Sequence, residues 1–254
     1  MKILALNATY RPEKTTTQLI RAALAGAASL GAETEMILLY QCRIAYCLNC
    51  LKCYQDLVSE IAPCSLKDDM DAILEKIKEA DGIIFGSPVH NGFVSGLMTV
   101  FFERLSWRVA RPGGSFLGIM MGIRSRLTGK TRALAAISSA GGMSAKMRKH
   151  CDDGTPWLRS NAPLMLHGAW IGDMYAGAVL KKMPRTEEDW NILYFLRGLS
   201  SEQLKEAETL GIKIAKALQE GNLQPVTLDK MVGPFSKGLI KLTGMFSRPY
   251  QTLD

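Results

Sequence analysis

The chain has 254 residues, of which 47% are hydrophobic and 22% are charged. These proportions are ordinary for a globular protein, and they exclude a small scaffold that depends on disulfides for its stability. The length fits one large α/β domain with additions better than two complete domains.

From the sequence we expect neither a membrane span nor a signal peptide. The longest nearly apolar runs, such as residues 116–123, are far shorter than the roughly 18 residues of a membrane-spanning helix. The N-terminal segment has too few apolar residues for a signal peptide. We therefore expect a cytoplasmic protein with no integral membrane segment, in which clustered cysteines indicate metal or redox chemistry and not disulfides.

The net charge of +7 is unevenly distributed. Residues 104–149 contain ten Lys and Arg residues and no Asp or Glu. Such a stretch favours an anionic partner, either a phosphorylated cofactor, an acidic electron-transfer protein or nucleic acid. A solvated basic surface is the alternative. Because no recognised nucleic-acid-binding module accompanies the stretch, we expect no nucleic acid as a partner.

Short apolar strands and amphipathic helices alternate along the chain. In chain order we expect a strand at 2–6, a helix from about 16, a strand at 34–40, a cysteine loop at 42–64, a helix from Ser65 with Asp68 as its capping-box partner, a strand at 82–85 and a helix at 94–107. We then expect an inserted loop at 108–130, strands at 131–138 and 163–171, a helix at 201–220 and a C-terminal tail at 221–254.

This alternation indicates βαβ units, and right-handed crossovers place helices on both faces of the sheet. The predicted fold is therefore α/β, with a doubly wound, five-stranded parallel sheet within residues 1–220 and the cysteine loop after the second strand. Ligands of such sheets bind beyond the carboxyl ends of the strands. The loops after the first, third and fourth strands are therefore the candidate site.

The loop after the first strand is suited to a phosphate. Its candidate ligands are Thr9, Arg11, Thr15, Thr16 and Thr17. A helix N-terminus presents unpaired N–H groups and a positive dipole to an anion, and hydroxyl and guanidinium groups add hydrogen bonds. Simple helix capping by Thr15 or Thr16 is the alternative.

The loop after the third strand is suited to a flat heteroaromatic ring. A turn of Ser, Pro, Asn and Gly leaves backbone groups free to face the edge of a ring. The candidate residues are Ser87, Pro88, Val89, His90, Asn91 and Gly92, together with Ser139 and Gly141 after the fourth strand. His90 could lie against the ring, and an ordinary surface histidine is the alternative.

These two loops resemble those of the NADPH-dependent FMN reductase group of flavodoxin-like proteins. The likeness is carried by Asn-Ala-Thr-Tyr-Arg from residue 7 and by Ala-Asp-Gly-Ile-Ile-Phe-Gly-Ser-Pro-Val-His from residue 80, and it covers about residues 1–145. It implies a flavodoxin-like fold, FMN with its phosphate in the first loop and its ring against the second, and NAD(P)H as a candidate electron donor. His90 and Tyr10 depart from the family, which usually has Tyr and Pro there.

Cys47, Cys50 and Cys53 form a C-x-x-C-x-x-C motif, whose spacing lets three thiolates converge on one cubane cluster. Cys64 is the best candidate for a fourth ligand. The layout resembles the iron–sulfur flavoproteins, a branch of the same superfamily whose C-x2-C-x2-C-x4-7-C motif implies a [4Fe-4S] cluster. Here the last spacing is ten residues.

Other interpretations of the cysteines remain open. Cys42 and Cys151 are secondary candidates for the fourth ligand. Structural zinc also accepts four thiolates, although it usually shows paired C-x2-C motifs. The cysteines could also be free thiols.

The resemblance implies an FMN-dependent oxidoreductase that passes electrons between flavin, cluster and a small-molecule substrate or ferredoxin-like protein, as a homodimer or homotetramer. A cluster-free NAD(P)H-dependent FMN or quinone reductase and a non-enzymatic electron carrier are the alternatives. We assign no catalytic acid or base, because the redox chemistry belongs to the cofactors. The tail is expected to cover a neighbouring subunit or, alternatively, to touch a membrane surface.

Overall fold

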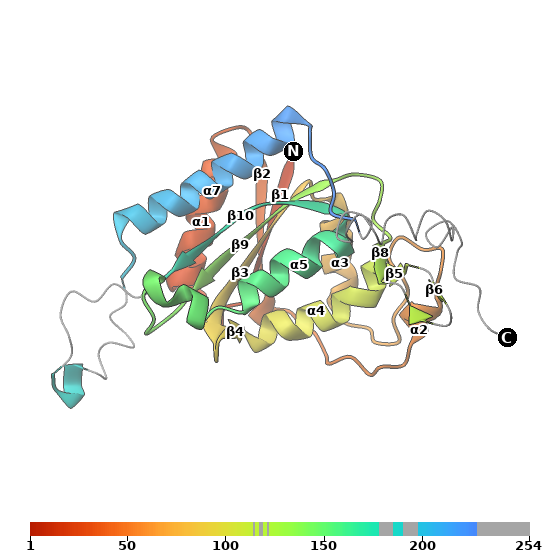
Figure 1. Cartoon of the computed structure of the whole chain (residues 1–254), viewed down its shortest axis with the longest axis horizontal. Coiled ribbons are helices and arrows are strands. Elements are labelled where there is room, and N and C mark those ends of the chain that lie inside the picture. Colours follow the sequence, from red (N-terminus) through yellow and green to blue (C-terminus); the bar gives the residue numbers. More distant parts are fainter. Residues whose placement is uncertain (114, 117–118, 121, 178–184, 190–197, 228–254) are drawn as a thin grey trace.

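The computed structural model describes residues 1–113, 115–116, 119–120, 122–177, 185–189 and 198–227. Its centre is a parallel sheet with the strand order β10-β9-β3-β1-β2 (Figure 1). The strands are β1 (Lys2–Asn7), β2 (Glu33–Leu38), β3 (Gly82–His90), β9 (Arg132–Ser139) and β10 (Gly168–Ala176). A two-residue strand, β4 (Phe93–Val94), pairs antiparallel with the end of β3. The order is that of a flavodoxin-like sheet, which confirms the predicted fold class.

Helices cover both faces of this sheet (Figure 1). One face carries α1 (Thr15–Ala28) and α7 (Ser201–Glu220), and the other carries α3 (Met70–Glu79), α4 (Gly96–Val109) and α5 (Gly154–Leu166). A separate buried apolar cluster lies on each side, because β1, β3 and β9 are apolar on both faces and bury both.

The helices α1 and α7 touch through small residues. A Cβ atom added at Gly211 would lie 1.7 Å from the carbonyl oxygen of Ala23, and one at Gly26 would lie 2.2 Å from that of Glu208. Only glycine allows backbones to approach this closely. Helix α7, whose predicted bounds are confirmed, therefore holds α1 against the sheet.

Three predicted boundaries were wrong by several residues. Strand β3 does not end at residue 85 but continues to His90, because its end pairs with β4, so residues 87–90, which were predicted to lie in a loop, belong to this strand. Helix α3 begins at Met70 and not at Ser65, because the Asp68 carboxylate accepts hydrogen bonds from Arg104 and from the backbone of Ala45 and caps no helix from Ser65. The last strand begins at Gly168, since Pro163 lies inside α5. An apolar run that ends one buried element and begins the next carries no sign of the boundary between them.

The segment predicted as an inserted loop at 108–130 contains short antiparallel strands. These are β5 (Ala110–Pro112) paired with β8 (Ile123–Ser125), and β6 (Ser115–Phe116) paired with β7 (Ile119–Met120). Strands of two or three residues are too short for a period-2 pattern to reveal. Of the predicted tail, residues 228–254 lie outside the described residues. Among the described helices, none is long and apolar enough to cross a membrane.

Candidate functional site

Three loops meet at the carboxyl edge of the sheet, since β1, β3 and β9 are neighbours with matching register. The N–H of Ala8 donates to the carbonyl of Gly86 at 2.8 Å, and the Ser95 hydroxyl donates to the carbonyl of Ala8 at 2.6 Å. The hydroxyl oxygens of Thr16 and Ser139 lie 2.9 Å apart. The predicted loops are therefore joined to one another at this edge, which we call the flavin edge after the ligand that the sequence resemblance predicts for it.

The first loop is held from within by its buried polar side chains. Asn7 donates to the Thr17 hydroxyl at 2.8 Å and accepts from the N–H of Thr9 at 3.2 Å. Thr16 and Thr17 are buried, so they shape the loop, whereas Arg11 is exposed and Thr15 is half-buried.

Helix α1 begins at Thr15 without a side-chain cap. Its N-cap residue is Lys14, which makes no side-chain cap hydrogen bond, so neither Thr15 nor Thr16 is the cap. The N–H groups of a first helical turn have no partner within the helix. The helix capping alternative is therefore wrong, and the start of α1 faces the loop with donors that suit an anion.

The second loop is a tight hairpin turn between β3 and β4. Asn91 and Gly92 have φ angles of 50° and 79°, as a two-residue turn of this kind requires. The Ser87 hydroxyl accepts from the N–H of Ser95 at 2.9 Å and donates to the carbonyl of Pro88 at 2.9 Å. The N–H of Asp153 donates to the carbonyl of Gly92 at 2.8 Å. The turn is thus fixed on both sides.

Two exposed aromatic residues, one from each of these loops, lie in parallel. The rings of Tyr10 and His90 have centroids 6.1 Å apart and planes inclined by 7°, and Tyr10 is 54% exposed. Tyr10 was not among the predicted site residues, because nothing in the sequence places it opposite His90. The pair gives the flavin edge a planar, aromatic rim.

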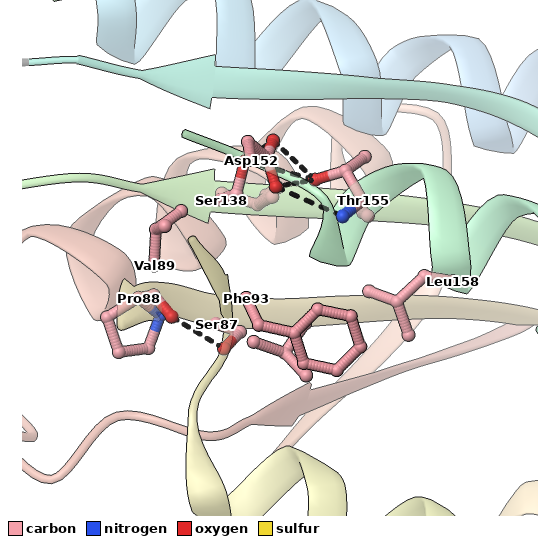
Figure 2. Close-up of a pocket in the computed structure, with 11 residues that line it drawn as sticks. Ser87, Pro88, Val89, Phe93, Ser138, Asp152, Thr155 and Leu158 are labelled. Atoms are coloured by element: carbon pink, nitrogen blue, oxygen red, sulfur yellow. Dashed lines mark hydrogen bonds between the residues drawn. The ribbon is translucent and has the colours of Figure 1, made fainter. Parts of the chain in front are cut away.

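A small pocket lies beneath the second loop, between the ends of β3 and β9 and the start of α5 (Figure 2). Its cavity volume of about 10 Å³ has room for little more than one water molecule and is far below the roughly 300–1,000 Å³ typical of ligand pockets. A three-ring flavin would therefore lie across the outside of these loops and not inside the pocket.

A buried carboxylate lines this pocket. Asp152 accepts hydrogen bonds from the Ser138 hydroxyl at 3.1 Å and from the hydroxyl and N–H of Thr155 at 2.8 and 3.0 Å (Figure 2). It also accepts from Arg148, which pairs with Asp173 on β10. No sequence motif indicates this network, which ties the third loop to the start of α5.

The third loop offers an open backbone. Ser139 is 2% exposed and is held by Thr16, whereas Gly141 and Gly142 are exposed, and an added Cβ at either would meet no described atom within 4 Å. This part of the edge therefore leaves room for a planar ligand.

Six of the ten basic residues at 104–149 are buried or paired with acidic side chains, so most of the stretch is not an anion-binding surface, contrary to one of our expectations. Its buried members are Arg104, Arg108, Arg126 and Arg132. The first three pair with Asp68, Asp71 and Asp56, which lie 36 to 70 positions away along the chain. The exposed remainder includes Lys146 and Lys149 beside the flavin edge.

Arg132 has no acidic partner among its described contacts. Its guanidinium donates to backbone carbonyls, including those of Ile77 at 3.1 Å and Leu166 at 3.1 Å. Burial lowers the pKa of Arg132 to about 10. Its role is to join α3, β9 and the end of α5, and no ligand is needed to explain it.

The four predicted cysteine ligands all lie within residues 47–64. Cys47 and Cys50 are exposed, and Cys53 and Cys64 are half-buried. Burial raises the pKa of the Cys53 thiol, and the neighbouring Cys64 and Cys47 raise it further. Cys50 lies 3.2 Å from the hydroxyl of Ser65, the residue after Cys64.

Hydrogen-bond donors point at these sulfurs. The Cys47 sulfur accepts from the N–H of Asn49 at 3.4 Å, and the Cys64 sulfur accepts from the N–H of Leu66 at 3.4 Å. N–H···S bonds are among the interactions that tune iron–sulfur centres. Within the described residues, however, no three potential ligands are already arranged to hold a metal ion. The donor set fits a thiolate cluster in its chemistry, and its side chains would have to turn toward one another to close it.

Cys42 and Cys151, the secondary candidates for the fourth ligand, contact other groups. Cys42 lies 3.5 Å from the carbonyl oxygen of Leu38, and burial raises the pKa of its thiol. Cys151 is buried beside the Tyr175 hydroxyl at 3.3 Å, next to the third loop. Both thiols therefore have neighbours other than the cysteine triplet in the described part of the chain.

Comparisons with known proteins identify the family of this chain. The family described as NADPH-dependent FMN reductase matches residues 1–170. An iron-sulfur flavoprotein of Methanocaldococcus jannaschii is 41% identical over 104 residues, which are 41% of this chain and 51% of that protein. One of Archaeoglobus fulgidus is 36% identical over 114 residues, which are 44% of this chain and 52% of that protein. The chain therefore matches about half the length of these curated relatives.

Solved structures share the fold at low sequence identity. An NAD(P)H:quinone oxidoreductase from Methanothermobacter marburgensis has a TM-score of 0.57 and 16% identity, over 84% of this chain and 98% of that one. An FMN-dependent NADH-azoreductase from Bacillus anthracis, solved with FMN, has a TM-score of 0.56 and 14% identity, over 85% and 98%. The family match covers most of the sheet and all three loops of the flavin edge. The chain belongs to the NADPH-dependent FMN reductase family.

Proposed function

We propose that this chain is an FMN-dependent oxidoreductase that also carries a [4Fe-4S] cluster. The observation that carries the proposal is the junction of three loops at the flavin edge, where Thr16 meets Ser139 and Ala8 meets Gly86 and Ser95. Membership of an FMN reductase family and relatives named iron-sulfur flavoproteins support it.

The first loop would hold the phosphate of FMN. Arg11 supplies an exposed positive charge, and Thr15 supplies a half-buried hydroxyl group at the uncapped start of α1. Thr9 is buried, and its hydroxyl accepts from the N–H of Arg11 at 3.2 Å, so it would act by holding Arg11 in place. The buried Thr16 and Thr17 support the loop from beneath. Neutral hydroxyls and helix N–H groups bind a phosphate without cancelling all of its charge.

The second and third loops would hold the flavin ring. The candidate contacts are Ser87, Pro88, Val89, His90, Asn91, Gly92, Ser139 and Gly141. The hairpin turn presents its backbone to the edge of the ring, and the open backbone at Gly141 leaves space beside it. Tyr10 and His90 would close one side of the site with aromatic surface.

Cys47, Cys50, Cys53 and Cys64 would hold the cluster. When both cofactors are bound, FMN exchanges one or two electrons and the cluster exchanges one, so a two-electron donor can supply a one-electron acceptor. NAD(P)H, a small-molecule redox substrate or a ferredoxin-like protein are partners with suitable chemistry. The protein supplies binding, orientation and exclusion of water.

Self-association as a homodimer or homotetramer completes the proposal. Exposed apolar side chains gather on the cysteine loop, at Tyr46, Leu48, Leu51 and Val58, and at the flavin edge, at Tyr10, Met143 and Met147. Exposed apolar residues that cluster in this way mark interaction surfaces. Helix α4 has 14 residues, so about 20 Å separate its flavin-edge start from its end beside the cysteine loop. A second copy could bring the two regions together.

Binding of FMN and of riboflavin to the flavin-free protein tests the phosphate assignment. Replacing Arg11 by Ala should weaken FMN binding about tenfold, because a charge-assisted hydrogen bond contributes roughly 1.5 kcal/mol or more. Riboflavin has no phosphate, so its affinity should not change. The Arg21→Ala variant, which removes an exposed arginine of α1 that pairs with Glu13 in the first loop, is the matched control. An equal loss for both ligands would contradict the assignment.

Two alternatives predict different observations. In a cluster-free NAD(P)H-dependent FMN or quinone reductase the cysteines stay free thiols, and iron analysis after anaerobic purification would find none. A non-enzymatic electron carrier would dock acidic ferredoxin-like partners through groups such as Lys146 and Lys149. Its rates would fall steeply with salt.

A further inference from the structure

The cysteine loop is held by arginine side chains much more than by regular structure. Residues 42–69 are all described, and the four-residue helix α2 (Lys52–Gln55) is the only regular element among them. Arginines from α4 and from the β5–β8 region reach into this segment and donate to its backbone carbonyls. The same arginines account for much of the basic stretch that has no acidic residue of its own.

Arg104 lies at the point where the two limbs of the loop meet. Its side chain is 1% exposed. Nη1 donates to the carbonyl of Ala45 at 2.7 Å, which lies before the cysteine triplet, and to Asp68 at 2.6 Å, which lies after Cys64. Nη2 donates to Asp68 at 3.1 Å and to the sulfur of Cys64 at 3.6 Å. One guanidinium therefore contacts the entry limb, the exit limb and a thiol.

Asp68 completes this junction. Its Oδ2 atom, which accepts from Arg104, also accepts from the N–H of Ala45 at 3.0 Å. Burial disfavours the charged carboxylate, but hydrogen bonds from Arg104 and from the backbone lower the pKa of Asp68 overall. A planar guanidinium that donates in two directions fixes geometry in a way that a lysine ammonium does not.

The ten-residue interval between Cys53 and Cys64 is folded by further arginines. Arg126 donates to the carbonyls of Cys53, Asp56 and Ser59, and Arg111 donates to that of Leu57 at 2.6 Å. These bonds fold the first half of the interval, from Cys53 to Ser59, around the Arg126 side chain. The related motif has only four to seven residues before its last cysteine. With ten residues here, Cys64 needs such contacts to be held in a fixed position.

We propose that Arg104 is a positioning residue that fixes Cys64 as the fourth thiolate of the cluster site. The inference rests on the proposed cluster and concerns how this chain accommodates its longer spacing. Arg104 acts by joining the two limbs at Ala45 and Asp68 and by donating to the Cys64 sulfur, so that Cys64 and not Cys42 or Cys151 faces the triplet.

The test compares anaerobically purified, full-length variants by iron and FMN content and by the reduction potential and electron paramagnetic resonance spectrum of the cluster. Arg104→Met should lower iron from four per chain to three or fewer and change the spectrum, with FMN content unchanged. Cys64→Ser should give the same result. The double variant should lose no more iron than Cys64→Ser alone, because both changes remove the same interaction, that between Arg104 and the Cys64 sulfur.

Arg108→Met is the matched control. Arg108 lies one turn further along α4, its side chain is 5% exposed and it contacts Ala62 and Asp71 but no thiol in the described structure. Because Arg108 holds the loop at Ala62 and not at a thiol, this variant should lose much less iron than Arg104→Met, and the iron that it keeps should have the wild-type reduction potential. Arg104→Lys keeps the charge but not the two-way donation, so it should lose iron as well. If Arg104→Met does not fold, Arg104→Lys with and without Cys64→Ser carries the same comparison.

Wild-type iron and potential in the Arg104 variants, or losses in the double variant that add, would overturn the proposal. Hydrogen exchange in the metal-free proteins tests the role of Arg104 even if the protein binds no cluster, so it distinguishes failure of this inference from failure of the proposed function. Arg104→Met should speed exchange on both limbs, near Ala45 and over residues 64–68, whereas Arg108→Met should affect only the region near Ala62. A wild-type protein that binds no iron would remove the cluster itself, while the exchange result would still report on the junction.

Discussion

The flavin edge and the cysteine loop are built in two different ways. At the flavin edge, topology places the loops, because neighbouring parallel strands end together and short hydroxyl and backbone contacts join the loops after them. In the cysteine loop, long arginine side chains from elsewhere in the chain fix a segment with little regular structure. The proposed FMN site thus depends on the order of the strands, whereas the proposed cluster site depends on side-chain contacts from other parts of the chain.

The strongest destabilisation should come from the packing beneath the flavin edge. Gly211→Ala places a Cβ atom against the carbonyl oxygen of Ala23, so α7 must move away from α1. We expect a loss of about 3 kcal/mol in the free energy of unfolding, measured with urea, because overpacking against backbone cannot relax. FMN affinity should fall with it, since α1 carries the first loop.

Gly129→Ala is the control for this change, because an added Cβ there meets no described atom within 4 Å. It should leave both stability and FMN affinity near their wild-type values. A Gly211→Ala protein of unchanged stability would show that the two helices are not packed as described.

Loss of an arginine that holds the cysteine loop should destabilise the protein without weakening FMN binding. Arg126→Met removes donors to the carbonyls of Cys53 and Ser59 and the ion pair with Asp56. Since buried carbonyls lose their partners, we expect about 2 kcal/mol of destabilisation and faster proteolysis of residues 53–59. FMN content should be unaffected. The control is Arg159→Met, which removes an exposed partner of Asp173 and should cost less than about 1 kcal/mol.

Acid sensitivity should reveal a smaller effect near the flavin edge. Burial raises the pKa of Asp173, but hydrogen bonds from Arg148 and Arg159 outweigh it and lower that pKa below its ordinary value. A lowered carboxylate pKa stabilises the fold above the unfolded value of about 3.9, and this stabilisation is lost as the pH falls through the folded value. Asp173→Asn should flatten the dependence of stability on pH below about 4, as measured by urea unfolding across pH. A variant with the wild-type slope would contradict the role of this pair.

The two regions also differ in how far the sequence predicts them. The parallel strands, the three loops and α7 follow from apolar runs and periodicity within short windows, whereas the order of the strands across the sheet is seen only in the structure. The arginine contacts do not follow from such patterns either, because the partners are far apart along the chain: Arg126 and Asp56 are separated by 70 residues and Arg104 and Asp68 by 36. A basic stretch with no local acid therefore suggested an anion-binding surface.

The same reason explains the errors around Asp68. A capping box was a sound local interpretation of Ser65 and Asp68, yet the carboxylate is taken by Arg104. The parallel rings of Tyr10 and His90 and the network at Asp152 depend on contacts between different loops, which no single motif reveals. The assignment of individual residues to FMN and to the cluster stays a prediction.

The decisive experiment on the two proposed cofactors is an anaerobic absorption spectrum of the wild-type protein, combined with chemical analysis of FMN, iron and sulfide. We expect one FMN, four iron and four sulfide per chain, with flavin bands and a broad cluster absorption that bleach on reduction. Purified protein that neither contains FMN nor binds it when it is added would contradict the proposed function.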